Sequence, residues 1–263
     1  MRASTQEPER VSPPVVALIV FFCILAGTLL GRSLRAALPD HHLGPDSKDV
    51  VMLGIGMIAT MTALILGLMT ASAKSSFDQV DAAVKHAATG ALALDRTLAA
   101  YGKQTKPVRD LVRNAIEFRL DASWPEERSQ APEMTTPATM PSPELIQRQI
   151  VDLSPKTEAQ RWFKSQALVL MSDVLLTRWA VFGATGSSIS TMFLVVVVFW
   201  LALIFGSFGL FAPRNPTVVT VLVVCALSVA ASVFLILEMD DPFNGIMKVS
   251  SAPLRYTLAN LGQ

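Results

Sequence analysis

The chain has 263 residues, of which 51% are hydrophobic and only 16% are charged, and its formal net charge is +1. Soluble domains carry about 25% charged residues, so this composition indicates a membrane protein. The near-zero net charge argues against nucleic acid as a partner, and Cys23 and Cys225 both lie in apolar runs, which argues against a disulfide framework.

The first two apolar runs predict a pair of membrane helices within residues 13–73, after a tail of residues 1–12. A hydrocarbon core of about 30 Å requires about 20 mostly apolar residues in a helix. The first run covers about 14–31 and closes at Gly31-Arg32, and the second covers 50–73 without a charge. A signal peptide is the alternative for the first run, but the acids in the tail favour a retained anchor.

A polar block follows over residues 74–188. Apolar residues at three- and four-residue steps continue from the second run, so one helix is predicted over 49–101, ended by Gly102. Residues 124–143 carry five prolines and predict a loop. A last helix is predicted from about 143 to 182, interrupted near Ser154-Pro155.

Two further apolar runs predict a membrane hairpin over residues 189–238, with a tail at 239–263. The helices cover about 190–212 and 216–237, and the Pro213–Pro216 segment separates them. The predicted fold is therefore all-α: a polytopic protein with four transmembrane helices and a helical cytoplasmic domain inserted between the second and third.

The charge distribution predicts the orientation of the chain. With four spans, both termini and the polar block share one side, and that side carries 18 of the 22 Lys and Arg residues. Near the ends of the spans, where the positive-inside rule applies, Lys74, Arg178, Lys248 and Arg255 favour the cytoplasm. We therefore expect an inner (plasma) membrane protein with both termini cytoplasmic.

The second run contains a row of small and hydroxyl residues, here called the small-residue row. Its members recur at steps of three and four: Gly56, Thr60, Ala63, Gly67, Thr70 and Lys74. Small residues allow close helix packing in lipid, so one interpretation is a packing seam. The other is a pore wall, with Met57, Met61 and Leu64 beside it as a hydrophobic gate.

Charged and polar residues gather at both ends of the last span. Arg214 and Asn215 form the hairpin tip, either as a solvated turn or as a contact to lipid phosphate. Glu238, Asp240 and Asp241, here called the acidic cluster, follow the span, although a helix C-terminus favours cations. Leaving the lipid accounts for their position; a salt-bridge cluster with bases such as Arg178 is the sharper hypothesis.

Motifs for catalysis or cofactor binding do not stand out in the sequence. His41 and His42 lie in a loop without the spacing of a metal site. None of the four apolar runs contains Asp, Glu, Lys, Arg or His, which argues against proton-coupled transport. We expect no enzyme, no metal and no cofactor.

Three segments resemble bacterial membrane proteins of the bestrophin-like domain family. They are RAALPDHHLGPDSKDVVMLGIGMIATMTALILGLMTASAKSSFD (35–78), FWLALIFGSFGLFAPRN (199–215) and FLILEMDDPFNGIMKVSSAPLRYTLANLG (234–262). Bestrophins are oligomeric anion channels with four membrane spans per subunit and a helical cytosolic region. The resemblance thus implies a passive ion channel, and the expected partners are the lipid bilayer, further copies of this chain and inorganic ions. A non-conducting membrane scaffold or sensor, acting through the cytoplasmic helices, is the alternative.

Overall fold

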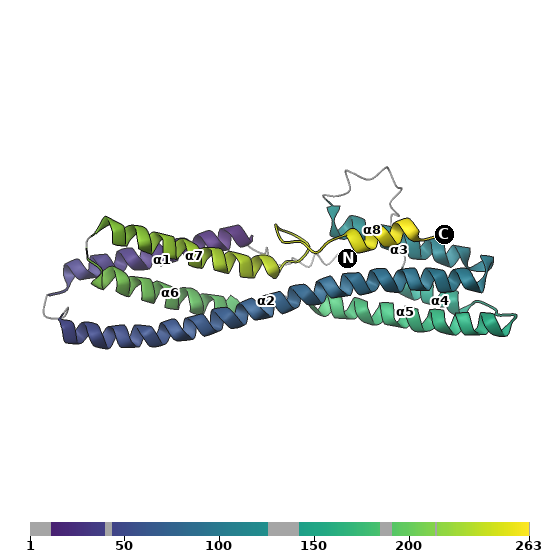
Figure 1. Ribbon diagram of the computed structural model, residues 1–263, viewed down its shortest axis with the longest axis horizontal. Coiled ribbons are helices and arrows are strands. Elements are labelled where there is room, and N and C mark those ends of the chain that lie inside the picture. Colours follow the sequence, from purple (N-terminus) through teal and green to yellow (C-terminus); the bar gives the residue numbers. More distant parts are fainter. Residues whose placement is uncertain (1–11, 40–43, 126–141, 185–190, 214, 263) are drawn as a thin grey trace, which may run out of the picture. The chain divides into compact units, whose positions relative to one another are not determined.

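The computed structural model describes residues 12–39, 44–125, 142–184, 191–213 and 215–262. Within these ranges every regular element is helical (Figure 1), and four helices are long and apolar enough to cross a membrane. The prediction of an all-α chain with four such helices is confirmed. The chain folds as two compact units: a membrane unit, Met1–Ser76 with Ser187–Asp240, and a polar unit, Phe77–Gly186 with Asp241–Gln263.

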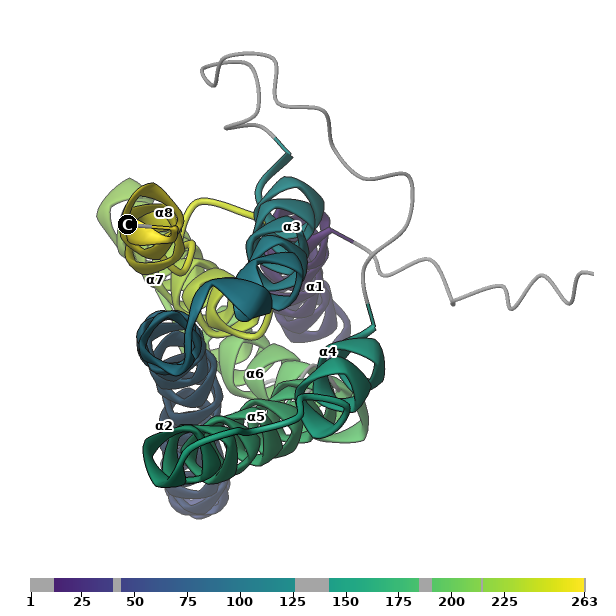
Figure 2. The ribbon, with the colours of Figure 1, turned by 90° about the vertical axis from the view of Figure 1, so that its right-hand side faces the viewer.

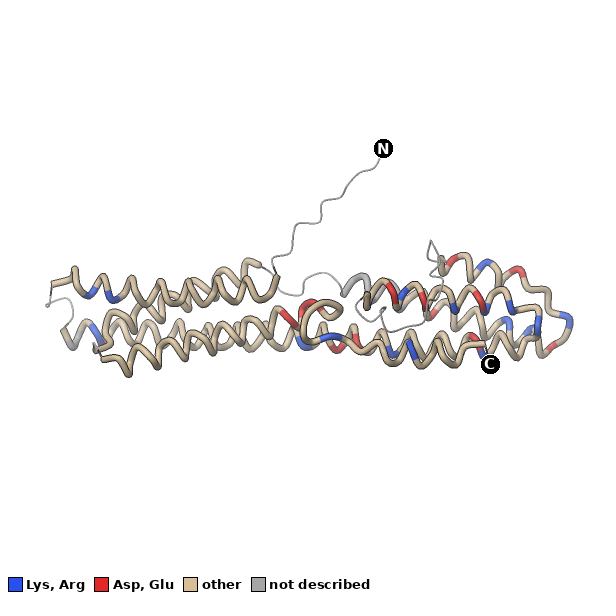
Figure 3. The backbone as a smooth tube through the Cα atoms, turned by 90° about the horizontal axis from the view of Figure 1, so that it is seen from above, with Lys and Arg blue, Asp and Glu red and all other residues tan. Residues whose placement is uncertain are grey.

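The membrane unit contains α1 (Pro13–Ala37), α6 (Thr191–Phe211), α7 (Pro216–Met239) and the first part of α2 (Pro45–Tyr101). Proline occupies the first turn of both α1 and α7, where a missing N–H costs nothing. Helix α1 packs against α6 and α7 (Figure 1), and long stretches of these helices carry no charge (Figure 3).

Glycines bring α1 and α6 into backbone contact. A Cβ on Gly31 would overlap the carbonyl oxygen of Gly206, and one on Gly209 would overlap that of Thr28. A Cβ on Gly27 would lie 2.5 Å from the carbonyl oxygen of Ala202. Gly27 and Gly31 form a GxxxG pair, the spacing that lets two membrane helices approach closely.

Helix α1 extends beyond Gly31-Arg32, where the predicted first span ends. Helix α1 continues to Ala37, and Gly31 lies inside it, buried against α6. Gly31 serves this close approach, so its presence does not indicate a helix end. Beyond it, Arg35 Nη1 donates to the carbonyl oxygen of Ala212, just after the last residue of α6.

Helix α2 is continuous over 57 residues, which confirms the predicted uninterrupted helix. At a rise of 1.5 Å per residue, its length is about 85 Å. It ends before Gly102, whose φ of 136° is a backbone conformation that residues with a Cβ rarely adopt. The long apolar segment and the amphipathic segment that follows it are thus parts of one helix.

The polar unit is built from the second part of α2 and the helices that follow it. These are the 3₁₀ turn Lys103–Thr105, α3 (Lys106–Ser123), α4 (Pro143–Val151), α5 (Glu158–Ala184) and α8 (Ala252–Asn260). Helix α5 lies beside α4 (Figure 2), and the break between them falls at the predicted Ser154-Pro155. Ser142 caps α4, because its hydroxyl accepts a hydrogen bond from the N–H of Leu145 at 3.1 Å.

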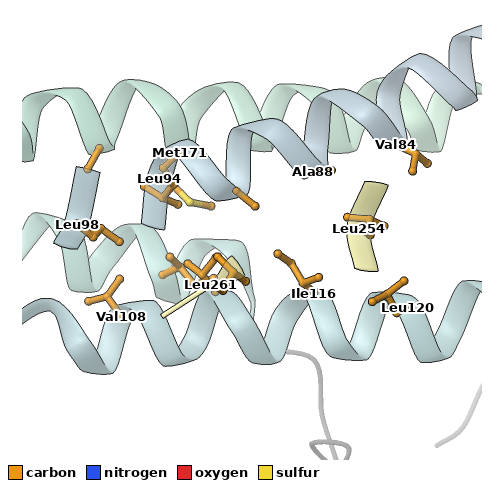
Figure 4. Close-up of a cluster of buried hydrophobic side chains, with 14 of the residues drawn as sticks. Val84, Ala88, Leu94, Leu98, Val108, Ile116, Leu120, Met171, Leu254 and Leu261 are labelled. Atoms are coloured by element: carbon orange, nitrogen blue, oxygen red, sulfur yellow. The ribbon is translucent and has the colours of Figure 1, made fainter. Parts of the chain in front are cut away.

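The core of the polar unit lies between α2 and α3 and is completed by α5 and α8 (Figure 4). Leu94 on α2, Ile116 on α3 and Met171 on α5 are buried in it. Helix α8 adds Leu254 to this core, and the buried hydroxyl of Thr257 donates to the carbonyl oxygen of Ala88 at 3.0 Å. The C-terminal helix is therefore an integral part of this unit.

A buried ion pair joins α2 to α3 in the same unit. Asp95 is 0% exposed, and its two oxygens accept from Arg109 Nε at 2.7 Å and Nη2 at 2.9 Å. The N–H of Gly262 donates to the same carboxylate at 3.2 Å. The hydrogen bonds that Arg109 donates to Asp95 raise the pKa of its guanidinium, so this side chain stays charged at any physiological pH.

Candidate functional site

The small-residue row lies on the outside of the membrane unit. Each of its six members is exposed, whereas Thr62 and Met69, on the adjoining row of α2, are buried. Successive positions of a helix are rotated by about 100°, so the two rows face different directions. One face of α2 thus packs within the chain, and the small-residue row does not share that contact.

The glycines of the small-residue row and those of the α1–α6 contact have different surroundings. A Cβ added to Gly56 or Gly67 would meet no atom within 4 Å, in contrast to Gly31 and Gly209 at the α1–α6 contact. The packing-seam interpretation therefore does not apply to the small-residue row within one subunit. Gly206 and Gly209 of α6 pack against the backbone of α1.

The hydroxyl groups of the row are bonded to their own helix. Thr60 Oγ1 donates to the carbonyl oxygen of Gly56 at 2.9 Å, and Thr70 Oγ1 donates to that of Leu66 at 2.8 Å. Each oxygen retains acceptor capacity, because a hydroxyl has two lone pairs. Lys74 follows Thr70 by one turn on the same face.

The three proposed gate residues are also exposed. Met57 is 62% exposed, Met61 53% and Leu64 74%. Large apolar side chains on this face suit lipid or another protein surface, because exposing them to water would be costly.

At the hairpin tip, Asn215 has a structural role that its sequence position suggests. It is the N-cap of α7, and its Oδ1 accepts from the N–H of Thr217 at 3.0 Å. Arg214 lies outside the described residues. The side chain that sequence reasoning missed here is Arg35, which binds the Ala212 carbonyl near the same turn.

The acidic cluster begins inside the last turn of α7. Glu238 is only 3% exposed, Asp240 is the C-cap of the helix, and Asp241 accepts from Asn244 Nδ2 at 3.2 Å. The helix ends at Met239, before Asp241-Pro242, and Gly245 has a φ of 110° in the turn that follows. The side chain of Arg178 lies outside the described residues, so the salt-bridge cluster stays a prediction.

Metal-binding groups do not converge in the part of the chain that the structure describes: no three His, Cys, Asp or Glu side chains are placed to share an ion there. His41 and His42 lie outside that part. In the membrane unit, the candidate functional features are the exposed face of α2 and the charged ends of the spans.

Comparison with known proteins agrees with the architecture. No curated protein and no solved structure matches the chain. A family match to the Bestrophin-like domain spans residues 20–254, which include all four membrane-capable helices from Val20 onward. This multi-pass membrane protein belongs to the bestrophin-like domain family.

Proposed function

We propose that this protein assembles as a homo-oligomeric ring in the inner membrane and conducts ions passively, with α2 of each subunit lining the path. The observation that carries the proposal is the exposed face of α2, where glycine and threonine alternate with large apolar side chains along a membrane helix. In a ring, one such face per subunit is enough to surround a central pathway.

The chemistry of this face suits passive conduction. The apolar runs contain no Asp, Glu, Lys, Arg or His that could relay a proton. Threonine oxygens can replace part of an ion's hydration, and the ring of Met61 side chains would form a constriction that closes when it loses its water. Lys74 would place a basic group at the mouth of this path.

The orientation in this proposal follows the positive-inside rule. Lys74, Lys248 and Arg255 follow span ends in the sequence, and these basic residues support a cytoplasmic location for the polar unit and both termini. The acidic cluster would lie on the same side, and we propose that it pairs there with basic side chains at the base of the cytoplasmic helices.

Single-channel recording of purified protein in liposomes tests this function. We expect Thr60→Val to lower the unitary conductance several-fold, because it removes an oxygen from the path, and Met61→Ala to raise the open probability by widening the constriction. Thr62→Val is the matched control: its hydroxyl also bonds to its own helix, at 2.7 Å to the Ile58 carbonyl, but it lies on the buried row.

The outcome separates the channel from a scaffold. Currents that change with Thr60 and Met61 and not with Thr62 support the pore. Stable oligomers that remain silent in chloride, sodium and potassium salts would contradict it and favour the non-conducting scaffold.

A further inference from the structure

Helix α5 carries a row of large apolar side chains on the outside of the polar unit, here called the α5 row. Its members are Trp162, Val169 and Leu176, which are 61%, 58% and 69% exposed. They follow one another at steps of seven residues, the period at which one helix packs along another. Ala167 and Met171, on the opposite side of α5, are buried in the core. The pore proposed above does not involve this row.

Small polar side chains lie beside the α5 row. Ser165 and Ser172 are both exposed, and the hydroxyl of Ser172 donates to the carbonyl oxygen of Val169 at 2.7 Å. A hydroxyl that is bonded to its own helix can be covered without losing that bond. Large apolar side chains in one line, with small ones beside them, therefore form a surface suited to a second helix, and leaving it in water is unfavourable.

The outer side of α2 in the same unit carries small side chains, here called the alanine row. Ala82, Thr89, Ala93 and Ala100 are all exposed, and they lie opposite the buried Leu98 on the helix surface. Between such small residues a helix surface is shallow, so that larger side chains of a facing helix can insert there. The alanine row is thus complementary in size to the α5 row.

Two contacts within the polar unit fix how α5 lies along α2 (Figure 2). Gln160 Nε2 donates to the carbonyl oxygen of Tyr101 at 3.2 Å, and His86 Nε2 lies 3.5 Å from Asp173 Oδ2. The two helices are therefore antiparallel, with Gln160 at the height of Tyr101 and Asp173 at the height of His86. The two contacts are about 22 Å apart along α2 and about 20 Å along α5, so the residues between them can be placed by interpolation.

The two rows coincide in height along these helices. The groups at equal height are Trp162 with Ala100, Val169 with Thr89 and Ala93, and Leu176 with Ala82. Just beyond the rows, the exposed Lys103 is at the height of Glu158, whose side chain is 86% exposed. Each large side chain of one row thus has a small one of the other at its own height, and an acid has a base.

We propose that the α5 row of each subunit docks onto the alanine row of the next copy of this chain. In a ring whose axis runs nearly along α2, neighbouring copies are related by rotation, which leaves the height of every residue unchanged. Large side chains then meet small ones, and Glu158 meets Lys103. The matching heights select a second copy as the occupant, because they relate two surfaces of this chain.

The size of the contact also favours a second copy. The α5 row is about 21 Å long, and its three side chains cover much less than the roughly 800 Å² that each partner of a stable complex buries. A soluble partner would have to bind to this row alone, whereas a second copy is also held nearby by the membrane. The contact rests on the homo-oligomeric assembly proposed above and specifies which surfaces join its subunits outside the lipid.

Disulfide trapping in the full chain, reconstituted in liposomes, tests the contact. In a background in which Cys23 and Cys225 are replaced by serine, the pair Leu176→Cys with Ala82→Cys should link neighbouring subunits under mild oxidation. A disulfide requires Cα atoms within about 7 Å of each other, so it reports direct contact. Because each subunit is linked to two neighbours, we expect a ladder of multimers on a non-reducing gel. A bond within one chain would leave a monomer.

A second pair and its exchange provide the matched control. Trp162→Cys with Ala100→Cys should give the same ladder as Leu176→Cys with Ala82→Cys. The exchanged pairs, Leu176→Cys with Ala100→Cys and Trp162→Cys with Ala82→Cys, contain the same substitutions but place the thiols about 27 Å apart in height. They should stay monomeric on the gel, and so should each single variant, since neither row meets itself.

The particle mass of the same samples in detergent separates this contact from the assembly itself. Ladders from the matched pairs alone support the contact. Oligomeric particles whose matched pairs form no ladder would overturn the contact and leave the proposed ring standing, whereas particles of a single chain would overturn both. Dimers from Leu176→Cys alone would also overturn it, as would quenching of a fluorophore on that thiol by brominated lipid, which would assign the row to the bilayer.

Discussion

Replacing Gly31 by alanine is expected to destabilise the membrane unit by about 3 kcal/mol, the upper end for an added methyl group in a packed interior. The new Cβ would overlap the Gly206 carbonyl oxygen on α6, and it would also lie 3.0 Å from the Leu210 nitrogen. Backbone atoms cannot turn away as a side chain can, so α1 and α6 must move apart. Equilibrium unfolding of the full chain in detergent measures the loss.

Gly54→Ala provides the control for this variant. Gly54 lies inside a membrane helix as Gly31 does, but a Cβ there meets nothing within 4 Å. Since alanine is the better helix former by about 1 kcal/mol, this variant should be neutral or slightly more stable. Equal stability of the two variants would show that the α1–α6 contact is looser than the structure has it.

Arg109→Met is expected to cost the polar unit about 3–5 kcal/mol, because it leaves the Asp95 carboxylate buried without its cation. The remaining N–H of Gly262 cannot replace a guanidinium that supplies two hydrogen bonds. Unfolding of the full chain, followed by circular dichroism, should show the loss.

Two comparisons identify the cause. The double variant Asp95→Leu with Arg109→Met should recover much of the loss, because an apolar pair removes the isolated charge. Arg113→Met removes the partner of Glu117 on the same helix, where the arginine side chain is 43% exposed, and should cost at most about 0.5 kcal/mol. If Arg113→Met were as damaging as Arg109→Met, burial of the ion pair would not be the explanation.

Much of the fold could be predicted because lipid imposes simple rules on sequence. The four apolar runs, the helix through residues 49–101 and its end at Gly102 each follow from local periodicity and composition. The full length of α1 could not be read in this way, because a glycine such as Gly31 can either end a helix or bring two membrane helices into contact. Its GxxxG spacing with Gly27 was the signal that would have identified it.

The candidate sites likewise differ in whether they depend on local sequence or on contacts between distant residues. The small-residue row could be predicted because its three- and four-residue period is visible in one short segment. Its exposure depends on which helices pack against α2, and residue spacing alone does not reveal that. The Asp95–Arg109 pair and the Gly262 contact join residues 14 and 167 positions apart.

The place of α8 in the chain has a consequence for biosynthesis. Leu254 and Thr257 complete a core whose other walls are translated before α6 and α7. At about 5–20 residues per second, the ribosome synthesises α8 several seconds after α5. The apolar core of the polar unit therefore stays incomplete while α6 and α7 are being inserted. Substitutions in α8 would reduce the yield of folded protein more than the function of the molecules that do fold.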